Sequence, residues 1–389
     1  MKRHILPIAL SLGVLGWVAW LVLRGPREPV YQGHSLTYWL QHYYIQPPNV
    51  PRSGAVLQAD PPAVAAIRQI GTNAIPTLLR LTRAHDSTLK LKLLALARKR
   101  NLIAIRLPNL ISIRFAFTSV SVSAGPLITG RHLIDMRFAP AAERNLQASL
   151  GFRELGPAAS NAVPALIAIY DANISPASQD AALVALSSIG PAAKQSVATL
   201  LRTLADTNNY ARLACVRALA SIHAEPQLVV PALIKSLSDP HFGVRMLAAE
   251  ALGQFGADAQ PAVPALVEIY DRNTADSLQA ATTLGLIGPA AKLAVPSLSR
   301  GLTNANLELC RLSLLSLGRI HAEPQWVVPA LIRCLSNTGE NIPFFSIMAL
   351  GQYGSEAASA RPALTNLLRD PNPNVRLEVT NALKRIDGA

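Results

Sequence analysis

The sequence predicts an all-α fold: a right-handed α-solenoid, in which helical hairpins stack into a superhelix, preceded by one N-terminal transmembrane helix. Three observations predict it. Turn residues recur at intervals of 32 to 34 residues from Gly156 onward. A proline-led apolar run follows almost every turn at the same distance. Residues 5–23 carry no charge. Such a period is typical of helical repeat arrays, whose hairpins bury their apolar faces only by stacking.

The uncharged stretch over residues 5–23, ILPIALSLGVLGWVAWLVL, predicts a membrane anchor. As a helix it measures about 28 Å, close to the hydrocarbon thickness of a bilayer. A cleaved signal peptide is the alternative, but such peptides have a shorter core and end at small residues. We therefore predict an uncleaved signal anchor, with residues 1–4 as a cytoplasmic tail. This makes the chain a single-pass protein of the bacterial inner membrane with its repeats on the exported side.

Residues 24–60 are predicted to form a juxtamembrane aromatic segment followed by a Pro-rich linker. Ser35 is a candidate N-cap for a short helix that carries Tyr38 and Trp39. This helix is either an interaction patch or an apolar cap on the first end of the solenoid, since repeat arrays need capped ends.

The next two segments are less regular. AIRQIGTNAIPTLLRL indicates that residues 61–100 hold a degenerate first helical hairpin. Residues 101–131 contain ISIRFAFTSVSV, in which apolar and polar residues alternate. This pattern has the period of a strand, so we expect either a hairpin insertion or a loop there.

A repeat array is predicted over residues 132–389, with seven clear units. Their turn residues are Gly156, Gly190, His223, Gly256, Gly288, His321 and Gly354. Eight residues after each turn comes Pro164, Pro231, Pro264, Pro296, Pro329 or Pro362, with Ala198 as the exception. Because proline is favoured at the first helical position, we expect the first helix of each unit to begin there. A polar turn and a second amphipathic helix follow.

The turn–Ala–Val-Pro-Ala-Leu pattern and an Asp followed six residues later by Arg recur together. This pair is present as Asp206/Arg212, Asp239/Arg245 and Asp370/Arg376. The array therefore resembles the armadillo/HEAT class, specifically the short bacterial HEAT-like repeats first associated with phycobilin-lyase proteins. The resemblance implies that the Asp/Arg pairs form a structural ladder. Two units depart from it, where Ala305 precedes Arg311 and Thr338 precedes Phe344.

A three-unit block has been copied within the array. IHAEPQLVVPALI from Ile222 returns as IHAEPQWVVPALI from Ile320, and ALGQFG from Ala251 returns as ALGQYG from Ala349. Each offset is 98 residues, which equals three units.

The net charge of +13 is confined to one end of the chain. Residues 1–150 hold 18 Lys and Arg against 5 Asp and Glu, whereas residues 151–389 hold 18 of each. A nucleic-acid-binding array would carry a basic stripe along its own length, so we expect no nucleic-acid partner. The basic end next to the anchor supports an alternative function, a module that binds a membrane surface.

The sharpest catalytic candidates are the copied pairs His223/Glu225 and His321/Glu323. They are comparable to the His-Glu motifs of HEAT-like deoxyhypusine hydroxylases, which implies a metal-dependent oxidoreductase as a second alternative. However, Ala separates His from Glu, and three stacked units place the pairs on the order of 30 Å apart. Both histidines also occupy a turn position. We therefore predict no catalytic residue, no metal and no cofactor, and neither oxidoreductase nor lyase activity.

Binding is the remaining function. The second helices of stacked hairpins line an extended surface that commonly holds proteins. Tyr210, Phe242 and Phe345 stand near the starts of these helices and are candidate contacts; the alternative is that they pack on the neighbouring unit. The sequence thus predicts a non-catalytic, membrane-anchored scaffold for protein partners that it does not identify.

Overall fold

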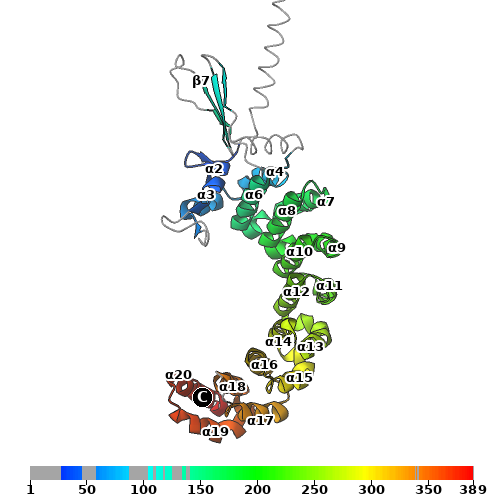
Figure 1. The fold of residues 1–389 in the computed structure, drawn as a ribbon, viewed down its shortest axis with the longest axis vertical. Helices are drawn as coiled ribbons and strands as arrows, with labels where there is room; N and C mark the ends of the chain where they lie inside the picture. Colours follow the sequence, from blue (N-terminus) through cyan, green and yellow to red (C-terminus); the bar gives the residue numbers. More distant parts are fainter. Residues whose placement is uncertain are drawn as a thin grey trace, which may run out of the picture. The chain divides into compact units, whose positions relative to one another are not determined.

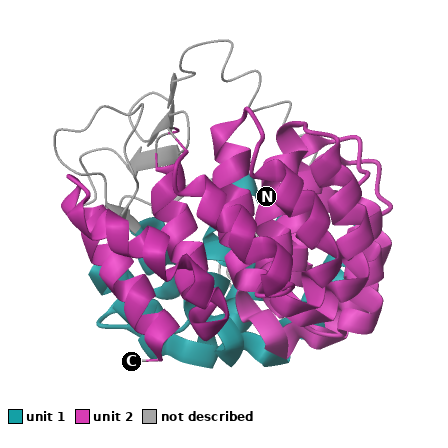
Figure 2. Ribbon diagram, turned by 90° about the horizontal axis from the view of Figure 1, so that it is seen from below, with its two compact units in different colours: residues 1–185 teal, residues 186–389 magenta. Residues whose placement is uncertain are grey.

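The computed structural model describes residues 28–45, 58–86, 104–107, 111–116, 119–124, 134–136, 141–337, 339 and 341–388 (Figure 1). The predicted membrane anchor over residues 5–23 lies outside this part of the chain. Two compact units divide the protein, residues 1–185 and 186–389, coloured separately in Figure 2. The boundary falls within helix α8 (Pro176–Ile189).

The first unit begins with a short helix, α2 (Leu36–Gln41), between two small antiparallel pairs, β1 (Val30–Tyr31) with β2 (His34–Ser35) and β3 (Tyr44–Ile45) with β4 (Gln58–Ala59). Ser35 caps this helix, because its hydroxyl accepts a hydrogen bond from the N–H of Tyr38 at 3.3 Å. Leu36 and Trp39 are buried where α2 packs on α3 (Pro61–Ile70) and α6 (Ala141–Leu155). This is the packing expected of an apolar cap.

The region predicted as a first hairpin over residues 61–100 is divided differently. Helix α3 ends at Gly71, which has a φ of +59° like the later turn glycines. A 3-10 turn, η1 (Gly71–Ala74), then leads into α4 (Ile75–Thr82), and α4 packs on α6. The first repeat unit therefore starts at Gly71, and its two helices are α4 and α6.

The segment between α4 and α6 is an insertion within this repeat unit. It contains a four-stranded antiparallel sheet in the order β5 (Ala104–Leu107), β6 (Ile111–Ala116), β7 (Ser119–Ala124), β8 (Ile134–Met136). The alternating sequence forms the β6–β7 hairpin, with Ile113 opposite Val122. The two ends of the insertion are joined, since Asp86 accepts a hydrogen bond from the N–H of Ala141 at 2.8 Å.

Later units repeat one plan, a turn, a connector, a first helix and a second helix. The first helices are α7 (Val163–Asp171), α9 (Val197–Thr203), α11 (Pro226–Ser236), α13 (Val263–Asp271), α15 (Val295–Gly301), α17 (Pro324–Cys334) and α19 (Arg361–Asn366). The second helices are α8, α10 (Asn209–Ile222), α12 (Phe242–Gln254), α14 (Ala275–Ile287), α16 (Leu307–Ile320), α18 (Ile342–Gln352) and α20 (Pro373–Asp387). A short 3-10 helix, η7 (Leu367–Arg369), follows α19.

Two kinds of connector follow from the two kinds of turn residue. After a glycine turn, a 3-10 helix of seven residues precedes the first helix: η2 (Gly156–Ala162), η3 (Gly190–Ser196), η4 (Gly256–Ala262), η5 (Gly288–Ala294) and η6 (Gly354–Ala360). After His223 and His321, the α-helix starts three residues on, at Pro226 and Pro324.

The predicted position of the repeated proline is therefore wrong in detail. In the glycine units that have it, such as α13 with Pro264, it is the second residue of the helix. In the histidine units, Pro231 and Pro329 lie inside α11 and α17. The sequence pattern marks the start of a helix only where the connector is a 3-10 turn.

The second unit consists of two helix layers (Figure 1). The second helices, α10 to α20 in even numbers, pack in chain order and line its inner side. In α10 to α18 a leucine four residues before each turn is buried: Leu219, Leu252, Leu284, Leu317 and Leu350. Glycines near the C-terminal ends allow close approach, because a Cβ at Gly285 would lie 2.9 Å from the Cα of Ser316 on the next helix.

Among the described residues, one helical stretch, Ala275–Gly301, is long and apolar enough to cross a membrane by length and composition. It comprises α14, η5 and α15, with a turn at Gly288, and half of its most apolar window is buried in the protein. It therefore forms parts of two ordinary repeat units.

Candidate functional site

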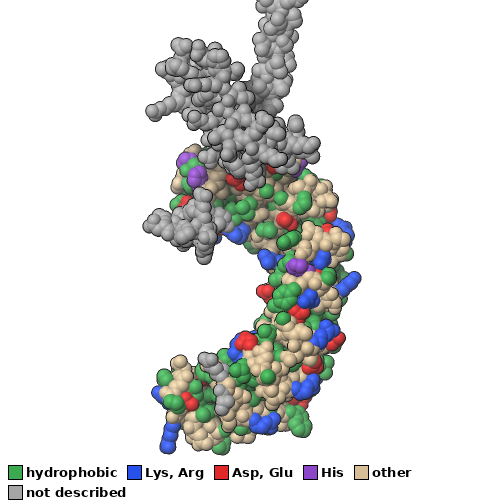
Figure 3. All heavy atoms as spheres, in the orientation of Figure 1, with side chains coloured by type: hydrophobic (Ala, Val, Ile, Leu, Met, Phe, Trp, Pro, Cys, Tyr) green, Lys and Arg blue, Asp and Glu red, His purple; other side chains and the backbone are tan. Residues whose placement is uncertain are grey.

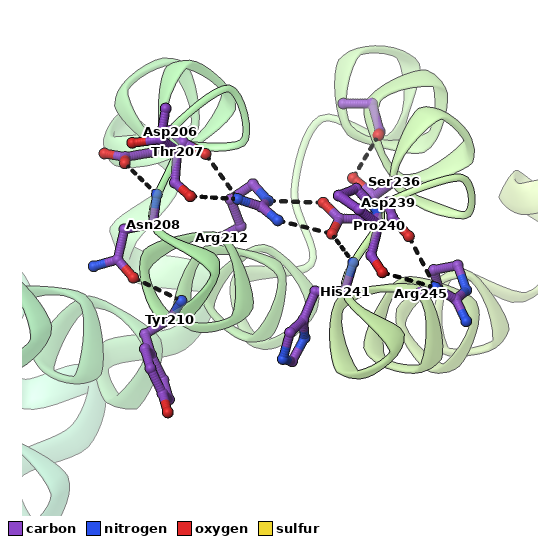
Figure 4. Close-up of polar contacts among 11 residues, drawn as sticks. Asp206, Thr207, Asn208, Tyr210, Arg212, Ser236, Asp239, Pro240, His241 and Arg245 are labelled. Carbon is purple, nitrogen blue, oxygen red and sulfur yellow. Dashed lines mark hydrogen bonds and ion pairs between the residues drawn. The ribbon is translucent and has the colours of Figure 1, made fainter.

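The inner layer exposes two of the three predicted contact residues. Tyr210 is 71% exposed and Phe242 is 51% exposed, each near the first residue of its helix. Asn208 starts α10 by accepting a hydrogen bond from the N–H of Tyr210, which places the Tyr210 side chain outside the hairpin. Figure 4 shows Tyr210 pointing away from the neighbouring polar contacts.

Phe345 behaves differently. It is half-buried, and the guanidinium carbon of Arg311, on the preceding second helix, lies 5.2 Å from its ring centroid. It also meets Phe344 edge-on, at 5.7 Å between centroids. Its contacts match the packing alternative, whereas the exposure of Tyr210 and Phe242 leaves them free to meet a partner.

The remaining inner surface is mixed in character. Half-buried or exposed apolar side chains continue along successive second helices, including Met246, Leu286, Leu315 and Met348. Figure 3 shows acidic and basic side chains interspersed over the visible face of the second unit. On that face no stripe of a single charge sign, of the kind that nucleic acid requires, is visible.

Arg212 and Arg245 each bind the backbone carbonyl of the aspartate in their own unit and the carboxylate of an aspartate in the next unit; Figure 4 shows both contacts for Arg212. Arg212 donates from Nε and Nη2 to both carboxylate oxygens of Asp239 in the next unit, at 2.7 and 2.8 Å. Its Nη1 donates to the backbone carbonyl of Asp206, six residues before it, at 2.9 Å. Arg245 repeats the pattern on the carbonyl of Asp239 and on the carboxylate of Asp276, at 3.0 and 2.8 Å.

The electrostatics of this ladder are those of a partly desolvated ion pair. The hydrogen bonds from Arg212 lower the pKa of the Asp239 carboxyl, and burial opposes this shift. The same contact raises the pKa of the Arg212 guanidinium. Since both side chains are only 10% exposed, the pair is shielded from salt more than a surface pair would be.

The ladder stops in the copied block, and its register differs from the predicted one. Asp206, Asp239 and Asp370 each accept a hydrogen bond from the N–H two residues later at 2.8 Å. Asn304 and Asn337 make the same turn, at 2.8 and 2.7 Å. These asparagines, and not Ala305 and Thr338, are therefore the equivalents of the ladder aspartates.

The arginine positions shift accordingly. An offset of 98 residues from Arg212 and Arg245 leads to Cys310 and Pro343. Arg311 instead pairs with Glu308 on its own helix, with Nε at 2.7 Å from Oε2. Arg376 keeps the contact within its own unit, to the backbone carbonyl of Asp370 at 2.7 Å. The copy has thus replaced both charges of each ladder pair by uncharged residues.

The predicted metal-binding alternatives lie in turns. His223 and His321 end α10 and α16 in the left-handed conformation, with φ of +48° and +49°. The ring of His223 stacks on Phe255, and that of His321 stacks on Tyr353. His321 Nε2 lies 2.7 Å from a carboxylate oxygen of Glu356. Glu323 accepts a hydrogen bond from Gln325 at 2.7 Å.

No group of three or more His, Cys, Asp or Glu side chains in the described part of the chain is placed to hold a metal ion. The three cysteines, Cys215, Cys310 and Cys334, are free and buried. Burial raises the pKa of the Cys215 thiol, and raises that of Cys310 to about 11. Both thiols are therefore protonated at neutral pH, which disfavours a nucleophilic role.

Comparison with known proteins shows which repeat family this part of the chain is similar to. A family model for HEAT repeats matches residues 197–287 and 328–389, together less than half of the chain. These segments are similar to HEAT repeats. They include the ladder pair Arg212–Asp239 and the contact of Arg376 with Asp370. A search of curated proteins finds no match.

Solved structures with a similar arrangement include an engineered protein, at 18% identity and a TM-score of 0.46 over 85% of this chain and 92% of the other. Yeast importin-beta is 13% identical with a TM-score of 0.47, over 64% of this chain and 39% of its own. The archaeal HEAT-like repeats protein from Thermococcus onnurineus NA1 is 16% identical with a TM-score of 0.43, over 57% of this chain and 97% of its own.

Two features of the structure differ from what the sequence predicts. The partner of Arg245 is Asp276, on α14, which has no place in the six-residue Asp/Arg spacing. A first hairpin was predicted over residues 61–100, but its second helix, α6, was not assigned to it because the insertion separates α6 from α4. The signal for it was present, since Gly71 and Pro76 carry the turn and proline of a unit with a shorter connector.

Proposed function

We propose that this protein is a non-catalytic, membrane-anchored scaffold that holds partner proteins on the inner layer of its HEAT repeats. The observation that carries the proposal is the exposure of Tyr210 and Phe242, 71% and 51%, at the starts of two neighbouring second helices. Aromatic side chains are enriched at the centres of protein interfaces, where they supply large contact areas at small entropic cost.

The surroundings of these two residues suit a protein partner. The guanidinium carbon of Arg245 lies 5.6 Å from the ring centroid of Phe242, which presents an apolar ring and a cation side by side. Their backbones are fixed by the caps and ladder contacts beneath them, so binding orders few groups. The helix starts that carry these two residues are therefore held in place, and their exposed side chains are aromatic.

The proposed anchor is residues 5–23, in the bacterial inner membrane, with the repeats on the exported side. Its length and lack of charge support this placement. Resistance of the full-length protein to carbonate extraction from membranes tests the anchor. Protease protection of the repeats in spheroplasts would contradict an exported array.

The scaffold role is tested by affinity capture of the full-length protein in mild detergent after cross-linking in cells. We expect a partner whose recovery falls at least fivefold with Tyr210→Ser and Phe242→Ser combined. The matched control is Leu368→Ser, which changes an exposed leucine next to α19 in the outer layer. Equal recovery with all three proteins would overturn a binding role for the inner layer.

A further inference from the structure

A second surface runs along the edge of the repeats where each turn enters its connector. We call it the connector edge, and define it by the residues two and five positions after each turn residue. In a 3-10 helix, residues three apart lie on the same face, so these two positions are neighbours in η4; in η5 and η6 a residue between them, Ala291 or Ala357, is non-helical and kinks the connector. In the histidine units they are the N-cap and the third residue of the α-helix, which are also neighbours.

The fifth position carries an apolar row through four consecutive units. Its members are Leu228, Pro261, Leu293 and Trp326, all exposed. Trp326 is 72% exposed, the highest value among the large hydrophobic side chains of the described residues, and Leu293 is 66% exposed. The units on either side have exposed polar residues there, Gln195 and Ser359. The row is therefore bounded and not part of a general apolar surface.

The second position carries an acidic row beside it. Glu225, Asp258, Glu323 and Glu356 occupy it in four of the five units from His223 to Gly354, with Ala290 in the fifth. All four are exposed. Lys292 is the one basic residue among positions two to five of these five units. The edge thus alternates carboxylates with apolar side chains.

Two of the acidic residues, Glu225 and Glu323, lie in a strained backbone conformation, whereas Glu356 pairs with His321. Glu225 and Glu323 have φ of +52° and +54°, a conformation that costs a residue with a side chain about 1–2 kcal/mol relative to glycine. Neither side chain caps the helix that it precedes. A strained position that holds a carboxylate without a capping role indicates a function for that carboxylate.

In the copied block the residues of the ladder have changed, whereas the acidic residues of the connector edge have been kept. Its ladder positions lost their charges, as Arg212 and Asp239 correspond to Cys310 and Asn337. At the connector edge, Glu225 and Asp258 correspond to Glu323 and Glu356, so all the carboxylates were kept. Leu228 corresponds to Trp326, a larger apolar residue.

We propose that the connector edge from His223 to Gly354 binds a Lys- and Arg-rich amphipathic helix of a partner protein. The apolar row contacts its apolar stripe, and the carboxylates pair with its cations. With neighbouring helices about 8–10 Å apart, the four-unit row is on the order of 25–30 Å long, which matches about 18 residues of α-helix. The inference rests on the proposed scaffold role but uses a surface other than the inner layer.

The probe is a fluorescein-labelled 18-residue peptide in which Leu and Lys alternate with helical period, titrated with the full-length protein in nonionic detergent. Fluorescence anisotropy, corrected for empty micelles, reports binding. A Leu/Glu peptide of the same pattern is the control. We expect saturable binding of the Leu/Lys peptide that weakens with salt, and at least tenfold weaker binding of the Leu/Glu peptide.

Two variants locate the site. Glu225→Gln with Glu323→Gln, and separately Trp326→Ser, should each raise the dissociation constant at least fivefold. Their matched controls, Glu268→Gln and Leu377→Ser, change exposed residues away from the edge and should stay within twofold. Equal affinity in the edge variants and the controls would overturn the proposal. Tyr210→Ser and Phe242→Ser should leave peptide binding unchanged, which separates failure of this site from failure of the inner layer.

Discussion

Arg212 and Asp239 are joined by two parallel hydrogen bonds, 2.7 and 2.8 Å long, that cross from one repeat unit to the next. Asp239 also accepts the N–H of His241, which fixes the turn before α12. One carboxylate therefore sets the loop of its own unit and attaches it to the preceding one. The bidentate geometry orients the two units as well as attracting them.

Replacing Asp239 with Asn should destabilise the second unit by about 2–4 kcal/mol, because it leaves the Arg212 guanidinium desolvated without its anion. The midpoint of urea denaturation, followed by circular dichroism, measures this. The matched control is Glu268→Gln, which breaks the exposed pair with Arg272 on α13 and should cost less than about 0.5 kcal/mol.

The copied block supplies a compensating change. Combining Arg212→Cys with Asp239→Asn installs the residues found at Cys310 and Asn337. Asn retains the turn, as Asn337 does by accepting the N–H of Gly339. We expect the double variant to be more stable than Asp239→Asn alone, since no charge is left unpaired. A double variant less stable than the single one would contradict the ladder interpretation.

Stability should also depend on pH through Asp239. Its pKa is lower in the folded protein than the ordinary value of 3.8, so the folded state favours the ionised carboxylate. The stabilisation is present above the unfolded pKa and is lost as the pH falls through the folded pKa. The difference in stability between the native protein and Asp239→Asn should therefore be constant from pH 5 to 7, values on the order of one unit or more above the usual carboxyl pKa, and should shrink below about pH 4. A difference that stayed constant down to about pH 2 would assign the effect to the turn rather than to the charge.

The close approach of α14 and α16 predicts that Gly285→Ala is destabilising. The added Cβ would lie 2.9 Å from the Cα of Ser316, and a backbone atom cannot move aside cheaply. Strain of about 1–3 kcal/mol should exceed the gain in helix propensity of about 1 kcal/mol. Thermal unfolding of the purified protein measures the balance.

Gly253→Ala is the control for this effect. Its nearest contact would be the Cδ1 of Leu286, at 2.8 Å, which belongs to an exposed and flexible side chain. The leucine can rotate away, so the variant should be neutral or slightly stabilised. Equal losses at both glycines would show that helix spacing is uniform rather than tight at Gly285.

Much of this architecture could be predicted because the same pattern of turn residue and apolar helices recurs in every unit. The turn positions, with glycine at Gly256 and Gly288, mark where a left-handed residue is required. The register of the ladder was within reach of the sequence, because the 98-residue offset from Asp206 leads to Asn304; the hydrogen bond that Asn304 accepts from the N–H of Asn306 confirms this register. The partner of Arg245 lies in another unit, and spacing within one unit carries no information about it.

The candidate surfaces also could be predicted only in part. Tyr210, Phe242 and Phe345 look alike in the sequence, but only packing shows that Phe345 lies beside Arg311. The connector edge could not be recognised from the sequence, because the pattern favoured an α-helix that starts at the proline and gave no sign of the two kinds of connector before it. Whether a side chain is exposed depends on how the neighbouring unit packs against it, and the sequence of a single repeat does not specify this packing.

The burial of all three thiols predicts that none reacts in the native protein. Cys215 and Cys310 are 0% and 1% exposed, and burial raises the pKa of each. Ellman's reagent at pH 8 should therefore show no rapid reaction, and three thiols should react after unfolding in guanidinium. A rapidly reacting thiol in the folded protein would place one cysteine at an accessible surface.

The turn role of His223 makes a prediction that a metal-binding role does not. Its φ of +48° suits Asn, which enters the left-handed region readily, and opposes Val, whose branched Cβ does not. His223→Asn should change the free energy of unfolding by less than about 1 kcal/mol, which reflects the lost stacking on Phe255. His223→Val should cost about 1–2 kcal/mol more, from the strain of a left-handed residue. Metal analysis of the purified full-length protein completes the test. If His223 serves only the turn, iron content is the same in all three proteins; loss of bound iron in both variants would revive the oxidoreductase alternative.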